Sequence, residues 1–185
     1  MALPPARTAG IPTFYKGIQF RSRLEAQWAA TLDLLEWEWD YEPFDCKGWI
    51  PDFVLKGALP ILLDAKPVAT FAECAAFGQK IVDSEPPYPV AIVGAGRLPL
   101  EGTNCCIGSF VAVGPDKDHP MALFDGHDLS IGKCCGKRDG MVWSTEWGGW
   151  HCGICGDWGK IYHDFRREFD DLWRRAKEES RWSPK

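Results

Sequence analysis

The sequence predicts an α/β or α+β fold, in which helices pack on a sheet, because its apolar segments change between helical and strand-like spacing. Apolar residues recur at helical intervals in residues 24–37, and residues 70–83 also suit a helix. Short apolar runs typical of strands occupy residues 49–55, 61–66, 89–94 and 108–113. The resulting order of helix, two strands, helix and two strands is typical of a sheet flanked by helices.

Local signals justify the first elements in chain order. The stretch TFYKGIQF, residues 13–20, alternates around a Lys-Gly pair and predicts a hairpin. Ser22 is a suitable helix N-cap, and Pro43 prevents the helix of residues 24–37 from continuing. A second Lys-Gly pair joins the strands at 49–55 and 61–66 by a tight turn, and the stretch EPPYP closes the second helix.

The C-terminal part of the chain differs in amino-acid composition from the rest. Residues 131–160 are rich in Gly, Cys and Trp, which suits a small lobe held by a metal better than a core helix. In residues 161–181, Phe165, Phe169, Leu172 and Trp173 recur at helical spacing among basic residues, and we expect an amphipathic helix packed on the main domain. We therefore divide the chain into a core (1–130), a Cys-rich lobe (131–160) and a basic helix (161–185).

The composition is that of a folded globular protein. The chain has 185 residues, of which 45% are hydrophobic, and contains ten Trp and ten Phe, which excludes an intrinsically disordered chain. The opening MALPPARTAG lacks the apolar core of a signal peptide, and no apolar run reaches the roughly 20 residues that span a bilayer. We expect a cytoplasmic protein that does not enter a membrane.

The charge distribution limits where a polyanion would bind. The formal net charge is −5, which argues against a surface that binds nucleic acid non-specifically. Basic residues outnumber acidic ones only in residues 133–185. Any electrostatic contact with nucleic acid is therefore expected mainly in the C-terminal third.

Three acids stand where the pattern predicts burial, and a lysine ends the series. Each has an ordinary explanation: Glu25 suits a capping box with Ser22, Asp52 suits a turn, and Asp64 suits a surface ion pair with Lys66. The joint pattern favours another interpretation, because Asp64 and Lys66 share one strand face and the neighbouring strand brings Asp52 alongside. Glu25 lies on the helix face that must pack on this sheet.

Three carboxylates and one ammonium group are therefore expected at one partly buried place. Like charges gathered in a low dielectric cost several kcal/mol unless a cation neutralises them. Mg²⁺ and Mn²⁺ prefer oxygen ligands of this kind. The acidic residues thus predict a divalent metal site.

Four segments of this region, SRLEAQWA, YEP, PDFVL and LLDAKP, resemble the PD-(D/E)xK nuclease superfamily, in particular its small phage and mobile-element members. The resemblance spans roughly residues 14–95, about half of the chain. It implies a restriction-endonuclease-like mixed sheet flanked by helices. One departure is Asp64, because relatives often carry the longer Glu at that position.

Carried over to this sequence, the resemblance implies a role for each residue of the cluster. Asp52, Asp64 and the carbonyl of Ala65 would be the principal ligands of Mg²⁺ or Mn²⁺, and Glu25 a further ligand. Lys66 would position or activate the attacking water. The implied reaction is hydrolysis of phosphodiester bonds in DNA, which leaves 5′-phosphate and 3′-hydroxyl ends.

The sequence thus favours a metal-dependent DNA nuclease with Mg²⁺ or Mn²⁺ as its catalytic metal. The alternative is an inactive protein of the same fold that binds nucleic acid or inhibits a partner protein, which the acidic net charge supports. Related enzymes often place a substrate-facing polar residue on the helix that follows the second strand. Gln79 and Lys80 lie there, and an ordinary solvated side chain is the alternative for each.

The cysteines predict a second, structural metal site. The sequence has no export signal, and four of its eight Cys lie between residues 134 and 155, so metal binding is favoured over disulfides. Cys152-Gly-Ile-Cys155 is half of a zinc knuckle. Cys134 and Cys135 complete a nominal Zn²⁺ set, although His151, His163 or His127 is an alternative fourth ligand. A reduced cysteine cluster buried among Trp is the alternative to any zinc site.

The remaining four cysteines lie outside this lobe. Free Cys is among the most buried residue types in proteins. We therefore expect core thiols at Cys46, Cys74, Cys105 and Cys106.

Overall fold

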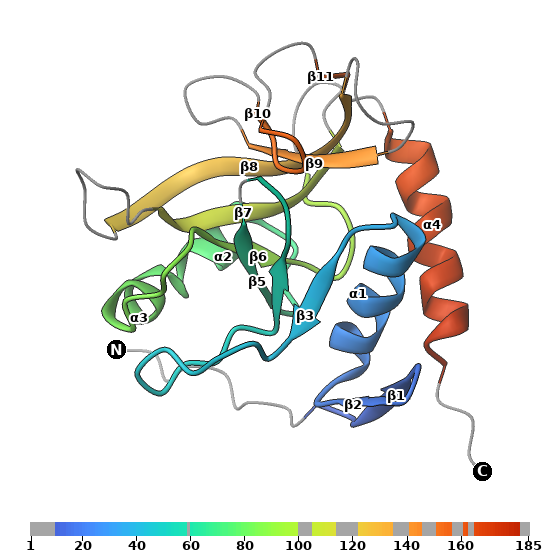
Figure 1. Cartoon of the computed structure of the whole chain (residues 1–185), viewed down its shortest axis with the longest axis horizontal. Coiled ribbons are helices and arrows are strands. Elements are labelled where there is room, and N and C mark those ends of the chain that lie inside the picture. The colour runs from blue at the N-terminus through green and yellow to red at the C-terminus, as the bar shows by residue number, and fades with distance from the viewer. Residues whose placement is uncertain are drawn as a thin grey trace.

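A computed structural model gives the fold of the chain. It describes residues 10–58, 60–99, 105–113, 122–134, 141–145, 151–156, 161–162 and 165–181, with the backbone alone for residues 113, 122–127, 133–134, 141–145, 151 and 161–162. Over these residues the chain is a mixed α/β protein that has a mixed sheet, a separate hairpin and a C-terminal helix (Figure 1).

One sheet forms the centre of the described structure. Its strands follow the spatial order β10-β9-β8-β7-β6-β5-β4-β3, and β11 pairs with β8. The pair β5–β6 is parallel, and the other described pairs are antiparallel. The strands are β3 (Trp39–Tyr41), β4 (Phe53–Leu55), β5 (Ile61–Ala65), β6 (Val90–Val93), β7 (Cys105–Val113), β8 (Ala122–Cys134), β9 (Met141–Thr145), β10 (His151–Cys152) and β11 (Ile161–Tyr162).

The elements outside this sheet follow the sequence signals closely, with one exception. Strands β1 (Thr13–Tyr15) and β2 (Ile18–Phe20) confirm the predicted hairpin, and α1 (Arg23–Leu34) confirms the predicted helix. The single helix predicted for residues 70–83 is wrong: the segment forms two short helices, α2 (Phe71–Ala75) and α3 (Gly78–Asp83). The break precedes Gly78, and glycine is a poor residue for a helix interior.

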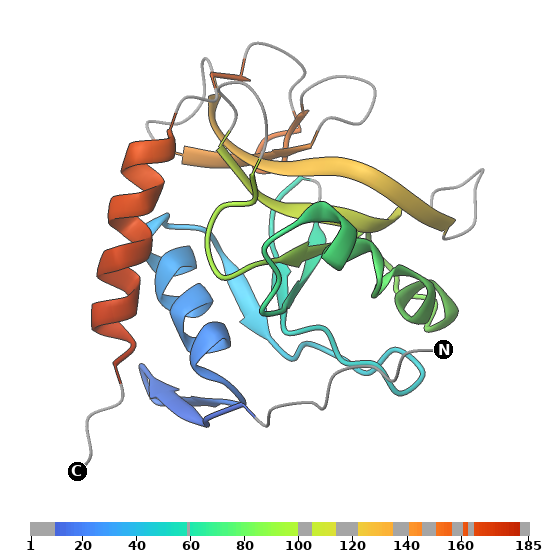
Figure 2. The same ribbon diagram turned by 180° about the vertical axis from the view of Figure 1, so that it is seen from behind.

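Side chains alternate between two cores, one on each face of the sheet. Phe53 and Leu63 pack in the core that also contains residues of α1 and α4 (Arg166–Glu179), whereas Val54 and Leu62 pack with residues of α2 and α3. The two-residue period of a strand sends neighbours to opposite faces. Figures 1 and 2 accordingly show α1 and α4 side by side, and α2 and α3 at a separate place on the sheet.

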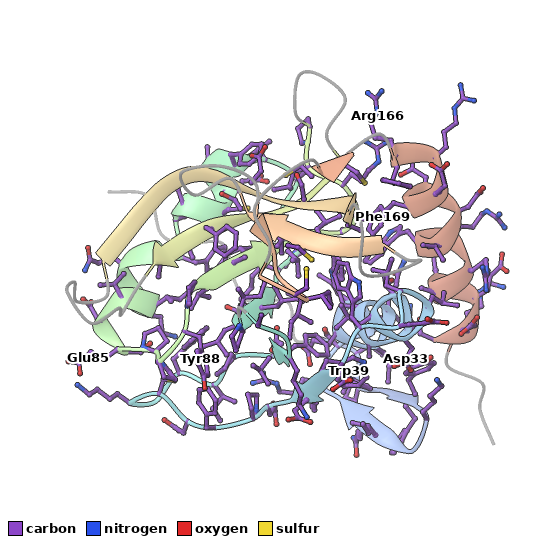
Figure 3. All side chains as sticks on the ribbon, turned by 45° about the horizontal axis from the view of Figure 1, so that its top comes forward. Asp33, Trp39, Glu85, Tyr88, Arg166 and Phe169 are labelled. Atoms are coloured by element: carbon purple, nitrogen blue, oxygen red, sulfur yellow. The ribbon has the colours of Figure 1, made fainter. Side chains whose placement is uncertain are left out.

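Asp33, in the last turn of α1, ties the hairpin to the sheet. Its Oδ1 accepts a hydrogen bond from Trp39 Nε1 of β3 (2.9 Å), and Figure 3 shows these two residues close together. Its Oδ2 accepts from the Tyr15 hydroxyl (3.1 Å) and from Lys16 Nζ (2.8 Å) of the hairpin. These contacts fix the segment between β2 and α1, which leads into the candidate site.

The predicted helix of residues 161–181 is wrong at its start, because Ile161–Tyr162 pair with β8 as strand β11 and the helix begins at Arg166. The helix itself packs on α1, which confirms the packing role expected of it. Phe169 is fully buried, and its ring centroid lies 6.2 Å from that of Trp28 on α1. Trp173 lies closer still, at 4.8 Å from Trp28, and Asp170 forms two hydrogen bonds of 2.8 Å with Arg97. Neither α4 nor another helix of the described part is both long and apolar enough to cross a membrane.

The C-terminal half of the chain extends the same sheet. β8 pairs with β7 on one side and β9 on the other, and it runs across the predicted boundary at residue 130. The backbone N–H of Ala58 donates to the Ile154 carbonyl (3.2 Å), which joins the β4–β5 turn to the Cys-rich segment. The division into a core, a lobe and a C-terminal helix stays a prediction.

Replacing Phe169 by Ala should test how much α4 contributes to the fold. The substitution leaves a cavity beside Trp28, so the free energy of unfolding should fall by about 3–5 kcal/mol in urea denaturation. Arg175→Ala, on the exposed side of the same helix, is the matched control and should stay within about 0.5 kcal/mol of wild type. Equal stability of the two variants would contradict the packing role of α4.

Candidate active site

Asp52 lies directly before β4, where the β4–β5 pair ends. Phe53 pairs with Leu63, so Asp52 stands opposite Asp64, one step beyond the last paired residues. Oδ2 of Asp52 accepts a hydrogen bond from the backbone N–H of Ala65 (2.7 Å). The carboxylate thereby takes the hydrogen-bonding place of a backbone carbonyl, and its side chain is only 3% exposed.

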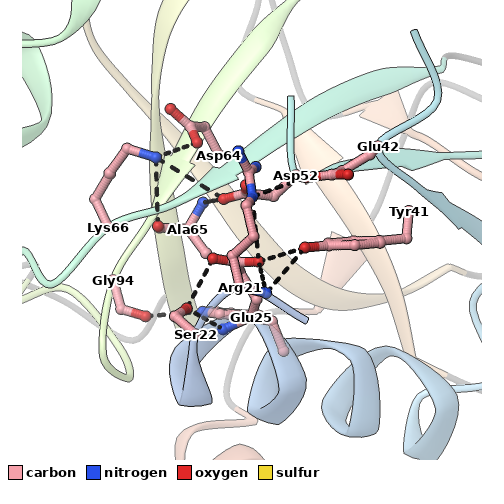
Figure 4. A network of polar contacts seen from close by, with 11 residues as sticks. Arg21, Ser22, Glu25, Tyr41, Glu42, Asp52, Asp64, Ala65, Lys66 and Gly94 are labelled. Atoms are coloured by element: carbon pink, nitrogen blue, oxygen red, sulfur yellow. Dashed lines mark hydrogen bonds and ion pairs between the residues drawn. The ribbon is translucent and has the colours of Figure 1, made fainter. Parts of the chain in front are cut away.

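Asp64 and Lys66 follow each other at the C-terminal end of β5, on the face opposite Leu63 and Ala65. Nζ of Lys66 forms an ion pair with Oδ1 of Asp64 and lies 3.8 Å from Oδ2 of Asp52. Figure 4 shows the lysine reaching over both aspartates. Asp52, Asp64 and Lys66 therefore share one place, as the strand pattern predicts.

Glu25 is held at the start of α1 by bonds of its own. Its backbone N–H donates to Oγ of Ser22 (3.1 Å), and its Oε1 accepts from the same hydroxyl (2.8 Å). Its Oε2 accepts from the Tyr41 hydroxyl (2.6 Å) and from the backbone N–H of Arg21 (3.1 Å). The carboxylate thus stabilises the helix N-terminus much as a capping box would, but through the N–H of the residue before the N-cap.

Arg21 is the site residue to which the sequence analysis assigned no role. Its Nη2 lies 2.7 Å from Asp52 Oδ1, its Nε lies 2.7 Å from Glu42 Oε1, and the same Nε lies 3.9 Å from Glu25 Oε2. Burial lowers the pKa of Arg21, but Asp52 and the other neighbours raise it by more, so the guanidinium stays charged. The sequence places Arg21 directly before the Ser22 cap and four residues ahead of Glu25. This position was the signal that could have predicted a contact between Arg21 and the acids.

The cluster has more carboxylates than cations. Among the described residues, Glu25, Glu42, Asp52 and Asp64 surround only Arg21 and Lys66. Burial and the nearby charge of Asp64 raise the pKa of Asp52 to about 8, from its ordinary 3.8, against the opposing effect of Lys66. Added positive charge, such as a bound cation, would therefore lower this pKa and stabilise the ionised carboxylate.

These features fit a hard divalent cation bound at Asp52 and Asp64. Two buried carboxylates stand opposite each other, and the carbonyl of Ala65, which lies 3.5 Å from Lys66 Nζ, belongs to the same strand end. No group of three Asp, Glu, His or Cys side chains in the described part of the chain is arranged to hold one ion. The set that fits best is thus Asp52, Asp64 and the Ala65 carbonyl, with Glu25 engaged by Arg21, Ser22 and Tyr41.

Gln79 and Lys80 lie on α3 and are exposed. Nε2 of Gln79 donates to Oδ1 of Asp83 on the same helix (2.8 Å). The α2–α3 junction itself approaches the site, because the Lys66 ammonium lies 6.0 Å from the centre of the Phe77 ring. A substrate-facing role for Gln79 and Lys80 stays a prediction.

Two of the predicted zinc ligands have described side chains. Cys152 is buried and Cys155 half-buried, and neither forms a disulfide with a described residue. Burial raises the pKa of Cys152, and the neighbouring Cys155 affects it in both directions. The side chains of the other candidates, Cys134, Cys135, His127, His151 and His163, lie outside the described residues.

The four cysteines outside the lobe confirm the expectation of core thiols. All four are free and buried in the described structure. Burial raises the pKa of Cys46, and it raises those of Cys74 to about 11 and Cys105 to about 12. Buried thiols that keep their protons suit packing better than metal binding.

Comparisons of the chain with known proteins identify no relative. Protein-family models, curated proteins and solved structures were each compared with the chain, and none matches. The functional argument therefore depends on the geometry and charge of the site.

The pH dependence of stability tests the raised pKa of Asp52. The folded pKa of about 8 exceeds the ordinary 3.8, so the folded state binds the proton more tightly than the unfolded state. In EDTA, this residue's contribution should make the free energy of unfolding fall as the pH rises from about 4 to about 8. Asp52→Asn should remove that fall, whereas Asp171→Asn, an exposed acid on α4, should keep it. Parallel curves for wild type and Asp52→Asn would contradict the raised pKa of Asp52.

Elemental analysis tests the Cys-rich segment. Protein purified without chelator should contain about one zinc per chain if Cys152 and Cys155 belong to a closed thiolate site. Cys152→Ser should lose the zinc and unfold at a lower temperature, because a structural ion contributes to folding. Cys46→Ser, which replaces a buried thiol far from Cys152 in the sequence, should keep the zinc. Zinc-free wild type with full thermal stability would refute the site.

Proposed function

We propose that the chain is a metal-dependent nuclease that hydrolyses phosphodiester bonds in DNA and leaves 5′-phosphate and 3′-hydroxyl ends. The observation that carries this proposal is the pair of buried carboxylates, Asp52 and Asp64, that shares one ammonium group, Lys66, at the ends of adjacent strands. Glu25, Asp52 and Asp64 are all buried, and only two cations, Arg21 and Lys66, face them. The excess of buried negative charge supports a site that binds a divalent cation.

Asp52, Asp64 and the carbonyl of Ala65 are the groups that would hold Mg²⁺ or Mn²⁺. Such an ion, when bound, polarises a phosphate oxygen and lowers the pKa of nearby water. Lys66, with its Nζ beside both aspartates and its side chain 24% exposed, reaches from the buried site toward solvent. It orients the attacking water and offsets the charge that grows on the phosphate.

The reaction adds one water molecule across one bond. The water oxygen forms a bond to phosphorus and loses a proton, the bond between phosphorus and the 3′ oxygen breaks, and the 3′ oxygen gains a proton. The phosphate stays on the 5′ side. Lys66 is the residue that would influence the first proton transfer, because its ammonium group lies beside both aspartates.

One observation favours the inactive binding protein as a second candidate. Each cation of the cluster is already paired, Arg21 with Asp52 and Lys66 with Asp64, so part of the negative charge is offset without a metal. An inactive protein would keep these pairs as permanent structural contacts. The two candidates differ in whether the site binds a divalent cation.

Substitution of the site residues separates the candidates. With Mg²⁺ or Mn²⁺ and a panel of labelled single-stranded, duplex and branched DNA, Asp52→Asn and Asp64→Asn should each lower cleavage by more than about a thousandfold. The double variant should be little worse, because either loss disables the unit. Lys66→Ala should lower the rate by about a hundredfold or more without weakening metal binding.

The control is Asp40→Asn, which removes an exposed carboxylate of β3 that pairs with Lys56 outside the site. It should cleave like wild type. Thermal unfolding of every variant verifies that lost cleavage is not lost folding. Wild-type cleavage in excess EDTA, or full activity of Asp64→Asn, would refute the proposed metal site. Wild type that neither cleaves DNA nor binds Mg²⁺ or Mn²⁺ would refute the nuclease and leave the binding protein.

A further inference from the structure

Arg21 contacts the candidate site from its solvent side. The residue lies in the extended segment between β2 and α1, and its guanidinium is at the centre of the network in Figure 4. Its side chain is 55% exposed, whereas that of Asp52, its partner at 2.7 Å, is 3% exposed. The positive charge that offsets Asp52 can therefore leave toward solvent without opening the core.

The two oxygens of Asp52 are held in different ways. Oδ2 accepts from the backbone N–H of Ala65 at the edge of a β-ladder, so its release would disturb the sheet. Oδ1 is held by the exposed Arg21 side chain. A divalent cation that binds Asp52 through Oδ1 leaves the bond to the Ala65 N–H intact. It then competes with Arg21 for the same oxygen atom.

A displaced Arg21 stays close to the site. Its Nε also pairs with Glu42, which is 33% exposed, at 2.7 Å, so a second contact keeps the guanidinium near the rim. A guanidinium presents a planar fork of donors that matches two oxygens of a phosphate. Arg23 lies two residues further on and is also exposed, but it forms no ion pair with a described acid. Of these two arginines, only Arg21 contacts the acids of the site.

We infer that Arg21 is a phosphate-binding residue that neutralises Asp52 while no divalent cation is bound and turns to a nucleic-acid phosphate when the cation takes Oδ1. The inference rests on the nuclease proposed above. It assigns Arg21 two anionic partners in succession, a carboxylate and then a phosphate. The site consequently presents its phosphate-binding group only in the metal-loaded state.

Metal binding alone gives the first test. Free Mn²⁺ is followed by electron paramagnetic resonance as it is titrated into wild type, Arg21→Gln, Arg21→Lys and Arg23→Gln. Without the competing guanidinium, Arg21→Gln should bind Mn²⁺ about three- to tenfold more tightly than wild type. Arg23→Gln removes the same charge from a neighbouring position and should stay within about twofold of wild type.

DNA binding gives the second test, with Ca²⁺ in place of Mn²⁺ so that binding is observed without turnover. Arg21→Gln should bind a labelled oligonucleotide, single-stranded or duplex, about tenfold or more weakly than wild type. Arg21→Lys keeps the charge but loses the fork, and should retain the Mn²⁺ affinity of wild type with intermediate DNA affinity. Tighter metal binding combined with weaker DNA binding is a signature that general destabilisation would not produce.

The outcomes separate this inference from the nuclease itself. Wild type that binds Mn²⁺ and cleaves DNA, while Arg21→Gln binds Mn²⁺ with equal or lower affinity, would overturn the role of Arg21 and leave the nuclease standing. Wild type that binds no Mn²⁺ would overturn both. If Arg21→Gln does not fold, Arg21→Lys decides, since DNA affinity equal to that of wild type overturns the inference.

Discussion

Two buried carboxylates on adjacent strand ends, Asp52 and Asp64, impose the constraint on which the site depends. Carboxylates this close and this buried repel each other strongly, and the raised pKa of Asp52 reflects that cost. The chain offsets the cost with a backbone N–H from Ala65, an ammonium group from Lys66 and a guanidinium from Arg21. Ala65 and Lys66 come from the end of β5 and Arg21 from the segment before α1, so two separate parts of the chain meet at the aspartates.

The rest of the described fold keeps those elements in place. Asp33 links the hairpin to β3, and the hairpin leads directly into Arg21 and the start of α1. The packing of Phe169 and Trp173 on Trp28 holds α1 from the opposite side, and the indole N–H of Trp28 donates to the Gly94 carbonyl after β6 (2.8 Å). Rigid elements far from the acids therefore determine where the acids meet, as a precise site requires.

The two cations of the cluster are not equivalent. Lys66 belongs to the strand that carries Asp64, and its ammonium bonds within its own segment. Arg21 arrives from a separate segment, is more than half exposed and pairs with an acid 31 positions away. The proposed metal binding depends on this difference between a fixed and a replaceable cation.

The sequence by itself determined the local elements and the partners within them. The Ser22 cap, the Lys-Gly turns and the two-residue strand period predicted the hairpin, α1, the β4–β5 pair and the shared face of Asp64 and Lys66, because these features depend on residues near in sequence. Only the tertiary structure decided that Glu25 bonds to Tyr41, that Arg21 faces Asp52, and that α2 and α3 are separate helices. The three-residue strand β3 left too short a pattern to detect, although it places Tyr41 beside the helix start. Contacts between distant segments depend on how helices and sheet pack together, and no local spacing encodes that packing.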